Sequence, residues 1–186
     1  MPTANILQVP GFIEESRCQR LIAIFERFAP MATRCDYTGN PVVYLSDDFL
    51  DEDSRREIGD VASKCQDAVE GRFGRVCQET IVLAMLPPGG FHPPHADNCK
   101  CDDAGEWVPN HTHERQVSAL VYLNDDFEGG EIVFGPLNVT IKPTAGLLLA
   151  FPSGHEHFHE VLAVTHGRRY SLPVWFVSEA TPASGD

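Results

Sequence analysis

The sequence is poor in positive charge and has no long apolar run. It carries 14 lysine and arginine residues against 27 aspartate and glutamate residues, a formal net charge of −13. Nucleic-acid binding needs clustered basic side chains that neutralise phosphates, so this balance argues against a nucleic-acid partner. No stretch approaches the roughly 18 consecutive apolar residues that suggest a membrane span. We therefore expect no membrane segment and a substrate that is neutral or basic.

Signals for export and for a disulfide framework are also missing. The N-terminal residues MPTANILQVPGF contain no basic segment followed by an apolar one, which a secretory signal would need. The six cysteines are spread along 186 residues, whereas disulfide scaffolds are small and cysteine-dense. We interpret most of them as reduced thiols and expect a cytoplasmic protein.

The length fits a single domain, residues 1–186, because the chain can bury one substantial core but is short for two. Apolar residues at helical spacing predict a helix from Ser16 to Phe28. A second helix is expected to start at Ser54, where Ser-Arg-Arg-Glu fits a capping box. We place this helical support at about residues 1–76.

Short apolar runs separated by Gly, Pro, Asn and Asp fill the rest of the chain, a pattern typical of β-strands. The expected strands cover residues 80–86, 116–123, 131–134, 139–141, 146–151, 159–164 and 169–177. Short antiparallel strands behind N-terminal helices predict a mainly β fold. Its core would be a jelly-roll, cupin-like barrel at about residues 77–178.

All eight histidines lie between positions 92 and 166, inside the expected barrel. His95 and Asp97 stand two apart on an extended segment, so their side chains point the same way and can share one metal. Two imidazoles and one carboxylate form the facial site of non-haem iron(II) oxygenases, which keeps positions open. The third ligand must come from another strand, and the candidates are His155, His157, His159 and His166.

Two arginines begin the last expected strand. Arg169 stands ten positions after His159 and is suitably placed to receive the distal carboxylate of a dicarboxylic co-substrate, because a guanidinium binds carboxylates in a bidentate way. Side chains alternate along a strand, so Arg168 should face away and have a structural role.

Three segments together resemble a known family: HADNC at 95–99, SALVYLNDDFEGGE at 118–131 and VLAVTHGRRYSLPVW at 161–175. The family is the prolyl hydroxylase branch of the Fe(II)/2-oxoglutarate-dependent dioxygenases, and the nearest members are the catalytic domains of collagen prolyl 3-hydroxylases (leprecan-like). The resemblance implies a double-stranded β-helix. The site residues that it implies are iron ligands His95, Asp97 and His159, the 2-oxoglutarate-binding Arg169, and two further co-substrate contacts, Trp175 and Ser118.

The implied reaction uses Fe(II), 2-oxoglutarate as co-substrate, dioxygen, and ascorbate as an accessory reductant. Oxidative decarboxylation of 2-oxoglutarate to succinate would drive hydroxylation of a C–H bond, and the resemblance implies a peptidyl proline as substrate, hydroxylated at C3. Many relatives carry a co-substrate-binding tyrosine on the strand before the His-x-Asp motif, whereas that strand reads IVLAML at 81–86 here. Another group must complete the pocket.

Several alternatives stay open at this point. The enzyme could instead hydroxylate a free amino acid or small metabolite, or the chain could be a non-catalytic cupin-like binding module. A second metal, zinc, could bind the thiolates and imidazoles of the loop after Asp97, whose candidate ligands are Cys99, Cys101, His111 and His113. We expect His92 and His111 to be solvated, and the histidines that do not bind metal to lie on loops or at the surface.

Overall fold

The computed structural model describes residues 5–35 and 42–179. Its main element is a seven-stranded antiparallel sheet. Its strands occur in the order β1-β12-β8-β15-β4-β3-β2. They are β1 (Leu7–Val9), β2 (Thr33–Cys35), β3 (Val42–Ser46), β4 (Val76–Leu86), β8 (Arg115–Tyr122), β12 (Leu148–Pro152) and β15 (Arg169–Ser178).

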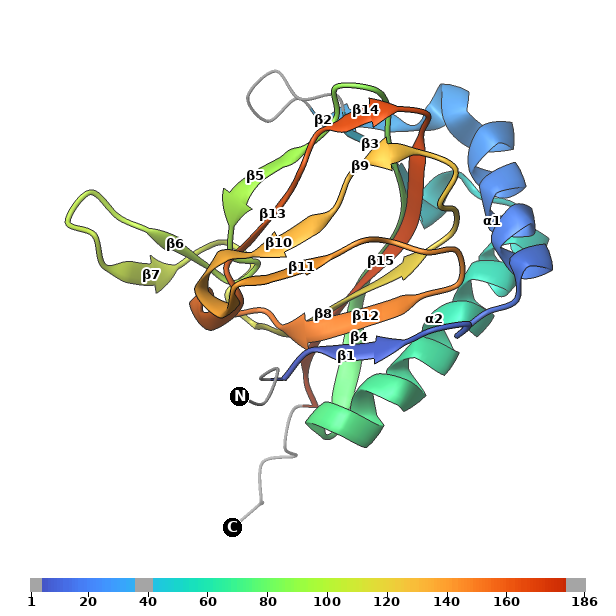
Figure 1. The fold of residues 1–186 in the computed structure, drawn as a ribbon. Helices are drawn as coiled ribbons and strands as arrows, with labels where there is room; N and C mark the ends of the chain where they lie inside the picture. The colour runs from blue at the N-terminus through green and yellow to red at the C-terminus, as the bar shows by residue number, and fades with distance from the viewer. Residues whose placement is uncertain (1–4, 36–41, 180–186) are drawn as a thin grey trace, which may run out of the picture.

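A smaller sheet in the order β11-β10-β13-β5 faces it and closes a barrel (Figure 1). Its strands are β5 (His92–His95), β10 (Ile132–Phe134), β11 (Val139–Ile141) and β13 (His159–Val161). Two ribbons complete the strands, β6 (Cys99–Cys101) with β7 (Trp107–Pro109), and β9 (Glu128–Gly129) with β14 (Val164–His166). The predicted fold class, a double-stranded β-helix with N-terminal helices, is confirmed.

Helices α1 (Glu15–Phe28) and α2 (Glu52–Phe73) cover the outer face of the larger sheet (Figure 1). Short 3-10 turns occupy η1 (Ala29–Met31), η2 (Asp47–Phe49), η3 (Gly135–Leu137) and η4 (His155–His157). In the described part of the chain, no helix is long and apolar enough to span a membrane.

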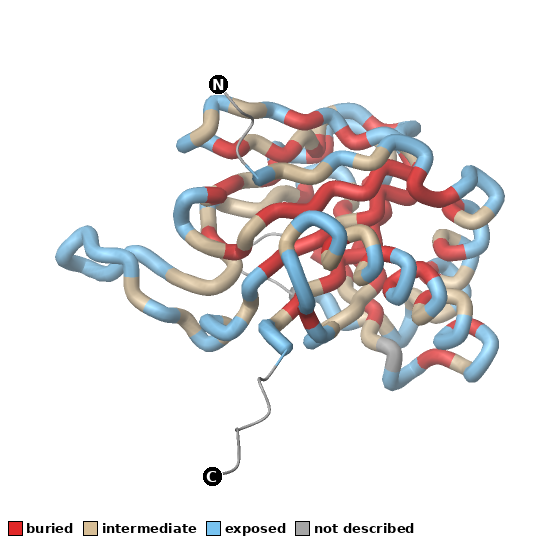
Figure 2. Tube along the Cα trace, turned by 90° about the horizontal axis from the view of Figure 1, so that it is seen from below, coloured by how far each residue is buried: buried red, intermediate tan, exposed pale blue. Residues whose placement is uncertain are grey.

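The larger sheet lies between two apolar cores, and the side chains of β8 contribute to both. Its Ala119 and Val121 pack toward the helices, while Leu120 and Tyr122 pack into the barrel, because successive side chains point to opposite faces. Figure 2 shows that the central strands are largely buried, whereas the β6–β7 hairpin at the left is mostly exposed. The inner face of β8 therefore carries the polar residues that can form a site.

Some local expectations were wrong. The first 76 residues contain three strands that join the larger sheet, so this support is not purely helical. Helix α2 begins before Ser54, because the Asp51 carboxylate accepts a hydrogen bond from the Ser54 amide (2.9 Å) and caps the helix. The strand expected at 159–164 is divided into β13 and β14, and the short strands β5, β6, β7 and β9 were not expected.

We predict that Gly146→Ala destabilises the fold by at least about 2 kcal/mol. Gly146 has φ +77°, and a Cβ there would lie 2.3 Å from the carbonyl oxygen of Ile13. A left-handed conformation alone costs an alanine about 1–2 kcal/mol, and backbone cannot easily move away. Urea unfolding measures the change. The control is Gly135→Ala, where a Cβ meets nothing within 4 Å; equal losses in both variants would contradict the argument.

Candidate active site and metal centre

Three potential metal ligands meet inside the barrel. His95 ends β5, Asp97 follows it by two residues, and His159 begins β13, which pairs with β5 so that His159 lies opposite His95. The ligand atoms of these three residues all lie within 4.8 Å of one another. Among the residues that the structure describes, no other group of three histidine, cysteine or carboxylate side chains comes together in this way. The pairing selects His159 from the four candidate histidines.

The two imidazoles are held by matching hydrogen bonds. Nδ1 of His95 lies 2.8 Å from the Pro93 carbonyl oxygen, and Nδ1 of His159 lies 2.9 Å from the His157 carbonyl oxygen. A carbonyl only accepts hydrogen bonds, so each Nδ1 carries the proton. Each Nε2 is therefore left with its lone pair, as a metal ligand requires.

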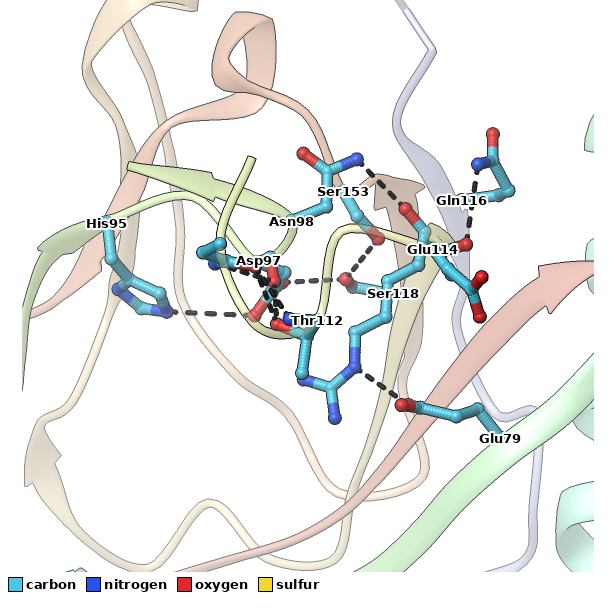
Figure 3. A network of polar contacts seen from close by, with 11 residues as sticks. Glu79, His95, Asp97, Asn98, Thr112, Glu114, Gln116, Ser118 and Ser153 are labelled. Carbon is cyan, nitrogen blue, oxygen red and sulfur yellow. Dashed lines mark hydrogen bonds and ion pairs between the residues drawn. The ribbon is translucent and has the colours of Figure 1, made fainter. Parts of the chain in front are cut away.

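The Asp97 carboxylate is oriented by a pair of buried serines (Figure 3). Ser118 donates a hydrogen bond to Asp97 Oδ2 (2.6 Å), and the Ser118 and Ser153 hydroxyls lie 2.8 Å apart. The other carboxylate oxygen, Oδ1, faces His95 Nε2 at 3.8 Å. One oxygen is thus fixed by the protein, while the other faces the centre of the triad.

The protonation states suit metal binding. Burial lowers the pKa of His159 to about 4, so its imidazole is neutral at pH 7. Burial by itself would raise the pKa of Asp97, but the neighbouring His159 and His95 and the Ser118 hydrogen bond outweigh it, and the pKa lies below its ordinary value. The His159 imidazole and the Asp97 carboxylate are therefore in the forms that bind a metal.

His92 adds a third imidazole beside the two of the triad, contrary to the expectation that it is solvated. His159 pairs with His95, and Val161 pairs with His92. Two positions along β13 therefore correspond to three positions along β5, which is a β-bulge or a similar irregularity. Prolines 93 and 94 stand at this irregularity, where their missing N–H groups do least harm. The ring centroids of His92 and His95 are 5.9 Å apart. Burial, and then nearby His95 and Arg169, lower the pKa of His92 to about 3.

Deeper in the barrel lies a buried positive charge without a carboxylate partner. Arg169 is 2% exposed, and its Nε and Nη2 have no hydrogen-bond partner among the described residues. The hydroxyl of Tyr122, which is 0% exposed, also has none, and the guanidinium carbon of Arg169 lies 4.9 Å from the Tyr122 ring centroid. An unpaired buried charge is strongly destabilising, so these three donors indicate a binding site for an anion.

Arg168, Ser118 and Trp175, which the sequence also singled out, lie in three different environments. Arg168 is exposed and lies 3.4 Å from Glu26, so it faces away from Arg169 as expected. Ser118 donates a hydrogen bond to Asp97, and its contact with the co-substrate stays a prediction. Trp175 pairs with Ser118 across the sheet, and its ring lies under the guanidinium of Arg115 at 4.3 Å.

The side chains of the competing histidines and of the candidate zinc ligands do not belong to the triad. His155 and His166 are exposed, but His157 is buried, contrary to expectation, with its ring stacked on Phe151. The loop cysteines and histidines proposed for zinc do not form a ligand cluster in the described structure. The sequence reasoning missed Tyr122, although period-two alternation from Ser118 places it on the same face of β8.

The model of the 2OG-Fe(II) oxygenase superfamily matches residues 81–177, more than half of the chain. The chain therefore belongs to this superfamily, and the family resemblance is confirmed. Its metal is Fe(II) and its co-substrate is 2-oxoglutarate. The matched residues include the triad, Tyr122 and Arg169.

Part of the chain is similar to prolyl 3-hydroxylases. Human (Homo sapiens) prolyl 3-hydroxylase 2 is 47% identical over 94 residues, and mouse (Mus musculus) prolyl 3-hydroxylase 3 is 50% identical over 93 residues. These matches cover 46% and 45% of this chain but only 13% of each relative.

Solved prolyl hydroxylases share the fold. A Pseudomonas putida prolyl-4-hydroxylase is 26% identical with a TM-score of 0.69, and the match covers 95% of this chain and 94% of that one. A Trichoplax adhaerens prolyl hydroxylase, solved with a peptide fragment of the hypoxia inducible factor oxygen degradation domain, has a TM-score of 0.73 at 17% identity, covering 98% and 88%.

The side chains fit the metal and co-substrate of the superfamily. The triad offers two nitrogens and a carboxylate oxygen, the donor set of facial iron(II) sites. Arg169 and Tyr122 offer three buried donors that lack partners in the described structure, which suits one carboxylate of a dicarboxylic acid. Tyr122 thus offers a buried phenol in the barrel, although the strand at 81–86 carries no tyrosine.

We predict that His95→Ala, Asp97→Ala and His159→Ala each weaken metal binding by at least about 100-fold, since loss of a supporting residue alone typically causes a 10- to 100-fold change. Cobalt(II) titration, followed by visible absorption, measures the affinity. His157→Ala is the matched control, because its backbone carbonyl, which orients His159, remains. Loss of binding in His157→Ala with retention in His159→Ala would show that the third ligand is misassigned.

The metal-free protein should lose stability on acidification below pH 6.5. The unfolded chain protonates His92 and His159 near their ordinary pKa of 6.5, while the folded chain does so only near 3 and 4. The unfolded state therefore binds more protons in this window, and stability rises with pH. From pH 6.5 to 4.5 the free energy of unfolding should fall by about 1–3 kcal/mol less in His92→Gln than in the parent protein. His166→Gln, at an exposed position, should not; equal pH profiles for parent and His92→Gln would refute the prediction.

Proposed function

We propose that this chain is a prolyl hydroxylase that acts on proline within an extended peptide, with C3 as the position hydroxylated. The observation that carries the proposal is the identity of 47–50% to prolyl 3-hydroxylases over some 94 residues. Two solved proteins of the same fold are prolyl hydroxylases too, and one of them is 26% identical to this chain. Because the match spans 13% of those enzymes, activity and substrate need a direct test.

We assign iron to His95, Asp97 and His159, and the distal carboxylate of 2-oxoglutarate to Arg169 and Tyr122. When bound, these groups supply the oxidising chemistry: dioxygen converts 2-oxoglutarate to succinate and carbon dioxide, and one oxygen atom enters a substrate C–H bond as a hydroxyl. The protein supplies orientation and exclusion of water.

The chain's own residues divide this task. The Arg169 guanidinium is positively charged and has only hydrogen-bond donors, so the buried end of the site is selective for an anion. The Ser118 hydroxyl holds one oxygen of Asp97, which prevents rotation of the carboxylate. The His95 side chain is 36% exposed whereas Asp97 is 11% exposed, so substrate approaches the triad from the side of His95.

We also propose a cytoplasmic location. Five cysteines whose side chains the structure describes, residues 18, 65, 77, 99 and 101, are free thiols, which suits a reducing compartment.

Arg169→Ala should raise the 2-oxoglutarate concentration needed for half-maximal rate by about 10- to 150-fold, because a hydrogen bond to a charged partner contributes roughly 1.5–3 kcal/mol. Tyr122→Phe should have a smaller effect in the same direction. Arg168→Ala is the neighbouring control and should leave this value unchanged, since Arg168 faces Glu26. Equal increases for both arginines would overturn the assignment.

The substrate is tested with iron-loaded protein and 2-oxoglutarate. A library of proline-centred peptides blocked at both ends is compared with free L-proline at equal concentration, and succinate release and peptide mass are measured. We expect a mass gain of one oxygen on peptides, and separation of 3- from 4-hydroxyproline after hydrolysis locates the hydroxyl. His159→Ala protein is the inactive control. Turnover of free proline with none of any peptide would replace this proposal with a small-molecule oxygenase.

A further inference from the structure

A short arm leaves the barrel directly after Asp97. The arm, residues 98–112, contains the β6–β7 hairpin and projects beside β5 (Figure 1). Both ends of the arm lie at the metal-site aspartate. Thr112 Oγ1 donates a hydrogen bond to the Asp97 carbonyl oxygen at 2.7 Å, and Nδ2 of the Asn110 side chain donates one to the same oxygen at 3.3 Å. Figure 3 shows Thr112 against Asp97. The arm is therefore anchored on the backbone of the metal site.

An aromatic cluster joins the arm to the turn before His159. Trp107 stacks on His155 with ring centroids 5.4 Å apart and 20° between planes, and it meets Phe158 edge-on at 5.4 Å. Trp107 is nevertheless 38% exposed, one of four exposed large apolar side chains among the described residues. Since His155 covers one face of the indole, the exposed area belongs to the rest of the ring. A solvated indole beside an active site can bind a ligand.

The arm that carries the indole is acidic in sequence. The arm carries Asp102, Asp103 and Glu106, with Lys100 as its only lysine or arginine. No ion pair involves these three carboxylates in the described structure, and the exposed Glu156 follows His155 directly. The Asp102 side chain accepts hydrogen bonds from the amides of Ala104 and Glu106, both 2.9 Å, so it shapes the tip of the hairpin. Among the described residues, the Asp103 and Glu106 carboxylates accept no comparable hydrogen bond from the hairpin backbone.

We propose that the arm is a docking surface for a substrate peptide, and that Trp107, with Asp103 and Glu106, binds an arginine or lysine side chain near the target residue. An aromatic face attracts a cation through its quadrupole, and nearby carboxylates add attraction. An arginine also stacks its planar guanidinium on an indole. A free amino acid has no flanking residue to reach this surface. The inference rests on the proposed function, because it requires a peptide substrate.

Binding is measured without turnover, so that docking and hydroxylation can be judged separately. Zinc replaces iron, 2-oxoglutarate is present, and blocked peptides with one central proline are titrated by calorimetry. A single arginine is moved one position at a time on either side of the proline, and each peptide is matched by one with citrulline, a neutral near-isostere. We expect arginine at one or two positions to bind about 3- to 30-fold more tightly than citrulline.

Trp107→Ala should remove this preference and leave the citrulline peptide's affinity nearly unchanged. The double variant Asp103→Asn/Glu106→Gln should reduce the preference and its salt dependence. Met31→Ala, at an exposed apolar position on the helical side, and Asp67→Asn, at an exposed position of α2, are the matched controls. Both should behave as the parent protein does.

Two results would overturn the inference: peptides bind with no arginine preference at any position, or Trp107→Ala retains the full preference. Either can occur while the iron enzyme still hydroxylates peptides, and the proposed function would then stand alone. Conversely, an arginine preference that depends on Trp107, without hydroxylation of any peptide, would support the docking surface and refute the prolyl hydroxylase assignment.

Discussion

The pairing of β5 with β13 is the constraint on which the site depends. It brings His159 opposite His95, although 64 positions separate them in the sequence, and Asp97 follows two residues after His95. The same pairing contains the irregularity at prolines 93 and 94 that turns His92 toward the triad. A shift of one residue would move each side chain of a strand to the other face. The metal site therefore exists only in this register.

The barrel interior changes in character along its length. At one end the larger sheet contributes the apolar Val42 and Leu86 beside Tyr122 and the buried Arg169. The triad follows, with Asp97 supported by Ser118. Farther along β8 and β15, Trp175 and Arg115 are only partly buried. The buried Arg169 end of the barrel thus suits the charged end of a dicarboxylic co-substrate, while the end at Trp175 and Arg115 is more exposed to solvent.

The buried Arg169 illustrates how stability and function conflict at this site. Its charge lies among apolar side chains, and Gly130 leaves room for it, because a Cβ there would come within 2.9 Å of Arg169 Cδ. Among the residues that the structure describes, no carboxylate forms an ion pair with it. A ligand that binds only the folded state would supply that missing charge and would stabilise the fold by mass action.

Local rules determined much of this protein from the sequence alone. Period-two alternation separated Arg168 from Arg169 and aligned His95 with Asp97, because strand geometry depends only on neighbouring residues. Apolar spacing located α1 and most strands of the larger sheet. The same rule, applied from Ser118, would have found Tyr122.

Tertiary structure decided what local rules cannot reach. His159 was one of four histidines until its strand was paired, and only packing showed that His157 is buried. The zinc alternative looked possible in sequence because its cysteines and histidines are close along the chain, yet the hairpin does not gather them into a ligand cluster. Helix α2 starts after an Asp51 cap rather than at Ser54, since either residue could cap a helix and the Asp51 carboxylate accepts the hydrogen bond from the Ser54 amide. Long-range pairing sets these outcomes, because contacts between distant segments are formed by the whole barrel and leave no periodic signal in any one stretch.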